Sequence, residues 1–181
     1  MTDTAPSADL PPVAAAPPHV LVADAESYVC NVVRAALDAD AYRVSRATTR
    51  SAAIRVLRGQ RPDLLLVDLL LSRALGLPLA LYAVNRGVPV IFTTGDRKMR
   101  RILARAGCPV LIKPLNVQEL TAAITRALAD SPAMCRRCRD AWQHLVSDHR
   151  ECDALLDCVG DLRQEMMAVF KTARQNRSAT L

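Results

Sequence analysis

The stretch VLVADAES, residues 20–27, passes directly from four apolar residues into two carboxylates that an alanine separates. A strand that is apolar throughout is typical of the interior of a parallel sheet, where helices cover both faces. Acidic groups at the end of such a strand are either solvated turn residues or part of a binding site. The other apolar runs of the chain bear on this choice.

Apolar runs of the same kind recur along the chain. They are HVLVA at 19–23, DLLLV at 63–67, PVIFT at 89–93 and PVLI at 109–112, with a weaker strand, YRVSRA, at 42–47. Stretches with apolar residues at helical spacing separate them. The strict alternation predicts an α/β fold, a doubly wound five-stranded parallel sheet with helices on both faces. The composition agrees with this fold, although alone it would also suit an all-helical chain.

The two ends of the chain differ from this pattern. Residues 1–18 contain five prolines and no long apolar run, which predicts a disordered leader rather than a signal peptide. We expect residues 175–181 to form a disordered tail. No segment approaches the roughly 20 apolar residues of a membrane-spanning helix, so we expect a cytoplasmic protein with reduced cysteines.

Polar residues directly follow four of the five predicted strands. Asp24 and Asp68 follow the first and third runs, Thr94 follows the fourth, and Lys113 follows the fifth. Because the carboxyl ends of parallel strands lie at one edge of a sheet, we expect these four side chains to converge there. Each residue alone would be an ordinary strand-end polar group, and the combination favours a site.

The segments VLVADAE, PDLLLVDLLLSRALGL, PVIFTTG and LIKP resemble the receiver domain of bacterial response regulators, over residues 19–130. The resemblance implies a flavodoxin-like sheet with the strand order 2-1-3-4-5. It also implies that the protein is a non-enzymatic member of a two-component phosphorelay, phosphorylated by a histidine kinase or a phosphotransfer protein.

The resemblance assigns roles to single residues. It implies that Asp68 is the phospho-acceptor and that Thr94 and Lys113 are the switch and phosphate-binding residues. It implies a Mg²⁺ site formed by Asp24, Asp68 and the backbone carbonyl of Leu70. These residue types suit the chemistry, because transfer to a carboxylate requires the charge on the phosphoryl oxygens to be neutralised.

Several positions depart from the family pattern. The family carries two adjacent acids after the first strand, whereas this chain has Asp24 followed by Ala25, which predicts weakened Mg²⁺ binding. Glu26 either replaces the missing ligand or simply favours the start of a helix. Ser72 replaces the usual proline, and Val110 and Leu115 stand where aromatic residues are common. A phosphorylation-independent pseudo-receiver scaffold is therefore the first alternative.

The predicted fourth helix, within DRKMRRILAR, is strongly basic. Its cationic residues are Arg97, Lys98, Arg100, Arg101 and Arg105. Residues 19–130 contain 16 Lys and Arg against 9 Asp and Glu, so the positive charge of the chain is concentrated there. These basic side chains either face solvent only, bind an acidic protein surface, or contact nucleic acid. Because of the last possibility, a transcriptional regulator that binds nucleic acid is the second alternative.

Residues 133–174 show a heptad pattern, predicted to form one long helix or two helices meeting near Gly160. Its proposed seam includes Trp142, Leu145, Cys152, Leu156, Val159, Met166 and Phe170. This coiled-coil-like extension is expected to form a homodimer or to dock onto a partner, with no DNA-binding output domain. The pairs CRRC and HREC could suggest zinc, but the helical separation of roughly 16 Å between them argues against one shared site.

Overall fold

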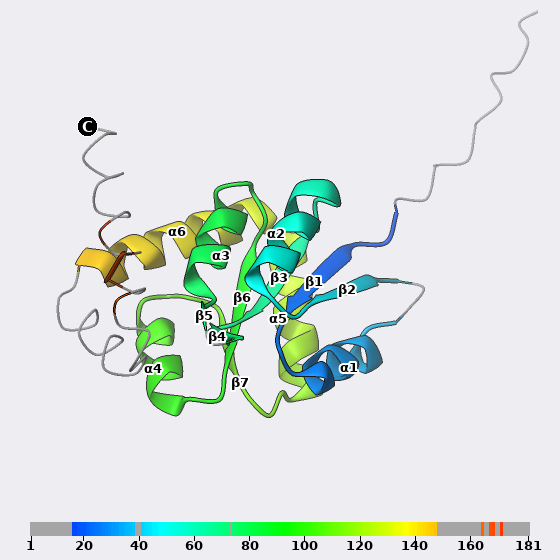
Figure 1. The fold of residues 1–181 in the computed structure, drawn as a ribbon. Coiled ribbons are helices and arrows are strands. Elements are labelled where there is room, and N and C mark those ends of the chain that lie inside the picture. The colour runs from blue at the N-terminus through cyan, green and yellow to red at the C-terminus, as the bar shows by residue number, and fades with distance from the viewer. Residues whose placement is uncertain are drawn as a thin grey trace, which may run out of the picture.

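The computed structural model describes residues 16–38, 41–72 and 74–147, together with the single positions 164, 167, 168 and 171. Five parallel strands form one sheet in the order β2-β1-β3-β6-β7 (Figure 1). They are β1 (His19–Ala23), β2 (Arg43–Ala47), β3 (Leu64–Asp68), β6 (Val90–Thr94) and β7 (Val110–Ile112). The predicted fold class and strand order are confirmed, and each predicted strand overlaps an observed one.

Helices cover both faces of this sheet (Figure 1). They are α1 (Ser27–Ala36), α2 (Arg50–Gly59), α3 (Leu77–Val84), α4 (Arg97–Arg105) and α5 (Val117–Ala129). Helix α1 packs beside α5, and α2 packs beside α3. Right-handed crossovers place these two pairs on opposite faces of the sheet.

Local sequence explains where several helices begin. Thr49 accepts a hydrogen bond from the backbone of Ala52 at the start of α2, and Asn116 caps α5 in the same way through Glu119. The side chain of Asp96 accepts from two backbone N–H groups at the start of α4. Such caps replace hydrogen bonds that the first turn of a helix lacks.

The core lies around the central strand β3. Its first four residues, Leu64 to Val67, are at most 1% exposed, as expected for a strand buried on both faces. Edge strand β2 is more exposed, which explains its weaker apolar pattern in the sequence.

A two-stranded antiparallel hairpin, β4 (Leu70–Leu71) and β5 (Ala74–Leu75), follows Asp68 directly. The sequence pattern did not predict it, because two-residue strands are too short to produce a detectable period. Gly76 closes the hairpin with a backbone hydrogen bond to the carbonyl of Leu69. A Cβ atom at Gly76 would lie 2.1 Å from the backbone oxygen of Asp68, so only glycine fits this position without movement.

The C-terminal extension begins with helix α6 (Ser131–Ser147), which packs on the sheet domain of its own chain. It contacts α3, α5 and β6. Asp130 caps the helix by accepting a hydrogen bond from the backbone of Ala133, and Pro132 is tolerated in the first turn. The helix therefore starts two residues earlier than the predicted extension and forms part of the same core.

The described part of the heptad seam is buried inside one molecule. Met134, Cys138, Ala141 and Trp142 join the core cluster that contains the strand residues, and Trp142 is 7% exposed. Trp142, which the heptad pattern assigns to a seam between two copies, is covered within its own chain in the structure. Leu145 lies in α6, but its side chain is outside the described residues, as are Cys152, Leu156, Val159, Met166 and Phe170.

The paired cysteines are not arranged as a metal site in the described part of the chain. Cys135 and Cys138 are buried free thiols, and no group of three or more His, Cys, Asp or Glu side chains placed to hold a metal ion is found there. His149 and Cys152 of the second pair fall outside it. None of the helices among the described residues is long and apolar enough to span a bilayer.

Candidate functional site

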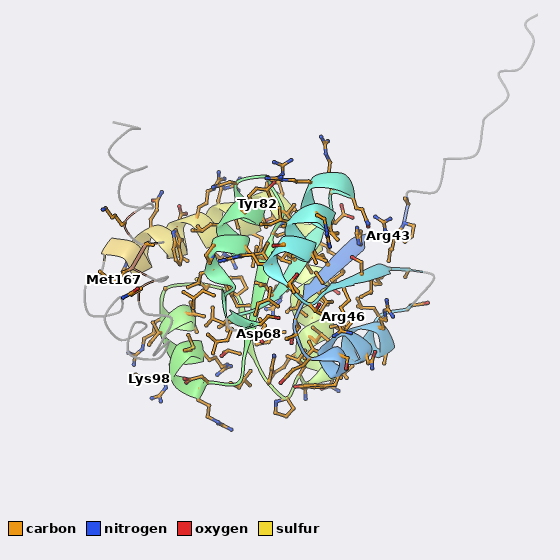
Figure 2. The ribbon with its side chains drawn as sticks, in the orientation of Figure 1. Arg43, Arg46, Asp68, Tyr82, Lys98 and Met167 are labelled. Atoms are coloured by element: carbon orange, nitrogen blue, oxygen red, sulfur yellow. The ribbon has the colours of Figure 1, made fainter. Side chains whose placement is uncertain are left out.

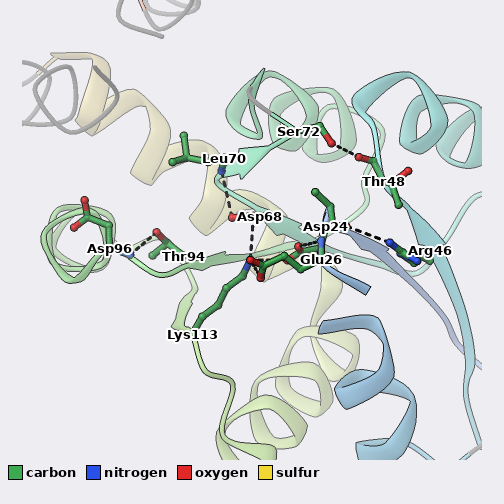
Figure 3. A network of polar contacts seen from close by, with 11 residues as sticks. Asp24, Glu26, Arg46, Thr48, Asp68, Leu70, Ser72, Thr94, Asp96 and Lys113 are labelled. Atoms are coloured by element: carbon green, nitrogen blue, oxygen red, sulfur yellow. Dashed lines mark hydrogen bonds and ion pairs between the residues drawn. The ribbon is translucent and has the colours of Figure 1, made fainter. Parts of the chain in front are cut away.

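The four polar residues singled out at the strand ends lie along one edge of the sheet (Figure 3). Asp68 and Thr94 are the last residues of β3 and β6, while Asp24 and Lys113 immediately follow β1 and β7. Backbone hydrogen bonds extend the strand alignment to this edge. Asp24 N donates to Ala47 O at 3.0 Å, and Lys113 N donates to Thr94 O at 2.8 Å.

The ammonium group of Lys113 lies at the centre of the site and contacts three carboxylates. Its Nζ is 2.8 Å from Asp24 Oδ2, 3.0 Å from Asp68 Oδ2 and 3.4 Å from Glu26 Oε2 (Figure 3). Lys113 donates hydrogen bonds to Asp68 and Glu26, and its contact with Asp24 is an ion pair. The structure thus brings together residues that are 44 and 45 positions apart in the sequence.

Backbone groups hold the two aspartates in place. Asp24 Oδ1 accepts a hydrogen bond from Glu26 N at 2.9 Å, and Asp68 Oδ1 accepts one from Leu70 N at 3.2 Å. Each carboxylate therefore has one oxygen fixed by the following turn and the other directed at Lys113.

Burial and ion pairing act in opposite directions on the charged groups. Burial raises the pKa of Asp24, which is 1% exposed, and the contact with Lys113 only partly offsets this increase. Burial alone would lower the pKa of Lys113, but its contacts with Asp24 and Asp68 outweigh burial and raise the pKa above its usual value. Lys113 is consequently a cation at neutral pH.

The pocket contains oxygen donors of the kind that Mg²⁺ prefers, but no three acidic, His or Cys side chains among the described residues are placed to hold a metal ion. Three carboxylates surround a single ammonium group, so the ionised pocket carries an excess of negative charge that a divalent cation would balance. Carboxylate and carbonyl oxygens are the ligands that Mg²⁺ prefers. In the structure, the Lys113 ammonium lies at the point where the Asp24 and Asp68 carboxylates meet.

Glu26 occupies the N-cap position of α1 without acting as a cap. Its backbone is extended and its side chain makes no hydrogen bond to the first turn, pointing instead towards Lys113. Ala25 presents only its backbone carbonyl to the neighbourhood, and that oxygen accepts a hydrogen bond from Arg46 at 3.2 Å. Arg46 was missed from sequence, although it lies near the end of β2 and therefore at the same edge.

Thr94 lies beside the charged group but is not bonded to it. Its side chain is buried, and Oγ1 accepts a hydrogen bond from Asp96 N at 3.1 Å. Within the described residues, no hydrogen bond joins the Thr94 hydroxyl to Asp68 or to Lys113. Asp96 thus links the Thr94 hydroxyl to the start of α4, a role that sequence reasoning did not assign.

The loop after Asp68 contacts a neighbouring loop. Ser72, in a left-handed conformation with φ of 49°, donates a hydrogen bond from its hydroxyl to the backbone oxygen of Thr48 (Figure 3). The predicted departure at Ser72 therefore has a structural use, because proline could neither donate this bond nor adopt a positive φ.

Helix α4 presents its basic residues to solvent. Met99, Ile102 and Leu103 face the core, whereas all five cationic residues of the helix are exposed. Lys98 projects away from the domain (Figure 2). Among the described residues, none of the five forms an ion pair with a carboxylate.

Comparison with known proteins agrees with this architecture. A family model described as the response regulator receiver domain matches residues 20–125. The chain is 33% identical over 109 residues to the probable transcriptional regulatory protein TcrX from Mycobacterium tuberculosis, covering 58% of this chain and 47% of TcrX. It is 29% identical over 150 residues to the sensor histidine kinase AruS from Pseudomonas aeruginosa, covering 75% of this chain and 15% of AruS. The chain thus spans less than half the length of either relative.

Solved structures show the same fold. A receiver domain protein from Clostridium thermocellum aligns with a TM-score of 0.54 and 23% identity, covering 64% of this chain and 98% of that one. The non-phosphorylated HemR receiver domain from Leptospira biflexa aligns with a TM-score of 0.52 and 26% identity, covering 62% of this chain and 94% of that one. With the family model matching more than half of its residues, this chain belongs to the response regulator receiver domain family.

Proposed function

We propose that this protein is a response regulator that accepts a phosphoryl group on Asp68 and signals through contacts with other proteins. The observation that carries the proposal is the placement of Lys113 Nζ 3.0 Å from Asp68 and 2.8 Å from Asp24. One partly accessible carboxylate thereby lies beside a fixed cation and a second, buried carboxylate. This is the charge arrangement that phosphoryl transfer to an aspartate requires.

In the proposed reaction, the Asp68 carboxylate attacks the phosphorus of a phosphohistidine on a histidine kinase or phosphotransfer protein. An O–P bond forms, the N–P bond of the donor breaks, and the released imidazole takes up a proton from solvent. Lys113 supplies positive charge beside the acceptor, and its raised pKa keeps it protonated. Asp24, Asp68 and the backbone carbonyl of Leu70 would hold Mg²⁺, which when bound neutralises charge on the phosphoryl oxygens.

Thr94 is the proposed switch residue. Its Oγ1 accepts a hydrogen bond from Asp96 N, which leaves the hydroxyl hydrogen available to a phosphoryl oxygen. Movement of Thr94 towards Asp68 would therefore pull on the start of α4, because Asp96 also caps that helix. The basic surface of α4 is the element that such a switch would reposition for an acidic protein partner.

The experiment that tests phosphoryl acceptance uses acetyl phosphate as the donor. The full chain is incubated with acetyl phosphate and Mg²⁺, and its intact mass is measured beside Asp68→Asn and Asp63→Asn. Asp63 is a matched control, because it immediately precedes the same strand, β3, but accepts a hydrogen bond from His19 N at the opposite edge of the sheet. A mass gain of one phosphoryl group is expected for the wild type and Asp63→Asn only. Equal labelling of Asp68→Asn, or none of the wild type, would contradict the proposal.

A phosphorylation-independent scaffold is the second candidate, favoured by Ala25. In this case the pocket keeps the Lys113 ion pairs as structural contacts, and partners recognise the unmodified domain. The absence of labelling, together with unchanged partner binding in Asp68→Asn, would support the scaffold.

A transcriptional regulator that binds nucleic acid through α4 is the third candidate, because all five cations of that helix are exposed. It predicts salt-sensitive DNA binding that is lost when Arg100 and Arg101 are replaced by glutamine.

Homodimerisation through the extension is proposed only for positions beyond α6, since the described part of the helix is used within the chain. Light scattering of the full chain and of a chain ending at residue 147 tests this. The truncation keeps α6, so a dimer that becomes a monomer would place the pairing surface beyond Ser147.

A further inference from the structure

We infer that Arg58, Tyr82 and Arg86 form a second docking surface, which binds an acidic segment of a protein partner. These three residues, here called the arginine–tyrosine cluster, belong to α2, to α3 and to the loop that follows α3. The inference goes beyond the proposed function, because that function assigns partner contacts to α4 alone.

The arginine–tyrosine cluster lies at the end of the domain opposite the phosphorylation site. Arg58 belongs to the last turn of α2, which leads into β3 at Leu64, and Arg86 lies in the loop that leads into β6. Asp68 is the last residue of β3, about 13 Å further along the strand than Leu64. A partner bound at the cluster therefore leaves the edge that carries Asp68 open, and its binding does not require phosphorylation.

Both arginines are organised around the Tyr82 ring, which lies where α3 meets α2 (Figure 2). Arg58 Nε donates a hydrogen bond to Tyr82 Oη at 3.0 Å, and the guanidinium carbon of Arg58 lies 5.8 Å from the ring centroid. The guanidinium carbon of Arg86 lies 5.3 Å from the same centroid, within the range of a cation–π contact. These contacts restrain two long side chains before a partner arrives, which lowers the entropic cost of binding.

No acid of α2 or α3 neutralises the charge of the cluster. Residues 49–62 and 69–95 contain no Asp or Glu, whereas Arg58, Arg86 and the neighbouring Arg55 and Arg61 are all exposed. In the ranges that the structure describes, none of these four arginines forms an ion pair with a carboxylate. Tyr82 uses the Nε of Arg58, but the two terminal nitrogens keep N–H groups that suit a carboxylate. The charge of this surface is therefore complementary to an acidic partner.

The contacts of Tyr82 favour a protein over a single-stranded nucleic acid. Surfaces that bind single strands use aromatic rings as platforms on which bases stack. The Tyr82 ring is already in contact with two guanidinium groups. Tyrosine and arginine are also the residue types that are enriched at protein interfaces and in their hot spots. An acidic protein segment needs only the outward N–H groups of the two arginines.

The test measures binding of a fluorescein-labelled hexaglutamate peptide to the full chain by fluorescence anisotropy at low salt. Every chain in the comparison also carries Arg100→Gln and Arg101→Gln, so that α4 competes less for the peptide. Arg58→Gln combined with Arg86→Gln is expected to weaken binding at least about fivefold, as for the loss of two exposed charged contacts.

Two further variants separate the cluster from a general effect of charge. Arg34→Gln combined with Arg126→Gln removes the same charge from exposed positions of α1 and α5, on the opposite face of the sheet, and should change the affinity less than about twofold. Tyr82→Phe keeps the net charge but removes the acceptor of the Arg58 hydrogen bond. It is expected to weaken binding about two- to threefold, because Arg58 is no longer held in place.

Several results would overturn the inference. They are no binding of the peptide, unchanged affinity in Arg58→Gln with Arg86→Gln or in Tyr82→Phe, and an equal loss in the control pair. A labelled oligothymidylate of similar length that binds more tightly than the peptide, and is lost in the same variant, would also overturn it in favour of nucleic acid. Acetyl phosphate labelling should be unchanged in Arg58→Gln with Arg86→Gln, so the proposed function stands or falls separately. Circular dichroism verifies that each variant is folded.

Discussion

Replacement of Trp142 by alanine tests whether α6 belongs to the folded domain. Trp142 is 7% exposed and packs in the core cluster that includes residues of the central strands. Truncation of a buried tryptophan to alanine costs about 3–5 kcal/mol, because apolar burial is lost and a cavity remains. Domains of this size are typically stable by about 5–15 kcal/mol, so the expected loss is a large part of the total.

The assay is urea unfolding followed by far-ultraviolet circular dichroism, since Trp142 is the only tryptophan and its fluorescence disappears with the substitution. At a typical urea dependence, the expected loss lowers the midpoint by roughly 2 M. Val117→Ala is the control, because Val117 is 51% exposed and its truncation should change stability by less than about 0.5 kcal/mol.

Protein concentration separates burial within the chain from burial between two copies. A seam between copies would make the wild-type midpoint rise with concentration, whereas burial within one chain does not. We expect the Trp142→Ala loss to be the same at all concentrations. A loss below about 1 kcal/mol, or a loss found only at concentrations where the protein dimerises, would refute the packing described for α6.

Three further predictions concern other parts of the domain. Gly76→Ala should destabilise the loop after Asp68 and reduce labelling by acetyl phosphate, because the new Cβ atom would clash with the Asp68 backbone oxygen. Gly59→Ala is the control. A Cβ atom at Gly59 would meet no atom within 4 Å, so this variant should change neither stability nor labelling. Burial and the adjacent Arg43 lower the pKa of His19 below its usual value of 6.5. The stability that His19 contributes is therefore complete above pH 6.5 and is lost as the pH falls through its folded-state pKa. The urea midpoints of the wild type and His19→Gln should accordingly converge in acid. Burial raises the pKa of the Cys138 thiol to about 11, so alkylation of Cys138 should be slow in the native chain and fast in urea. Equal alkylation rates in the two conditions would contradict the packing of α6 on the domain.

The parallel sheet was predictable because both of its signals are local. Apolar strands such as 63–67 and the helical spacing between them depend on burial at fixed periods, and burial is what the structure shows for β3. The convergence of Asp24, Asp68 and Lys113 followed from topology alone, since parallel strands end at one edge.

The remaining features depend on contacts that a sequence period does not specify. The heptad spacing of Cys135, Cys138 and Trp142 describes an apolar face, but the same face fits a second copy or the sheet of its own chain. Here it packs on α3, α5 and β6. Similarly, the alternatives for Glu26 differ only in side-chain direction, and the direction towards Lys113 emerged from the tight turn at Asp24.

The central claim is that Asp68 is the residue that accepts the phosphoryl group. Borohydride reduces an aspartyl phosphate to homoserine, so peptide mapping after labelling with acetyl phosphate and reduction identifies the modified residue. We predict homoserine at position 68, with none at Asp24 or Asp63 and none in Lys113→Ala labelled under the same conditions. Homoserine at another aspartate, or at no position in the wild-type chain, would contradict the account.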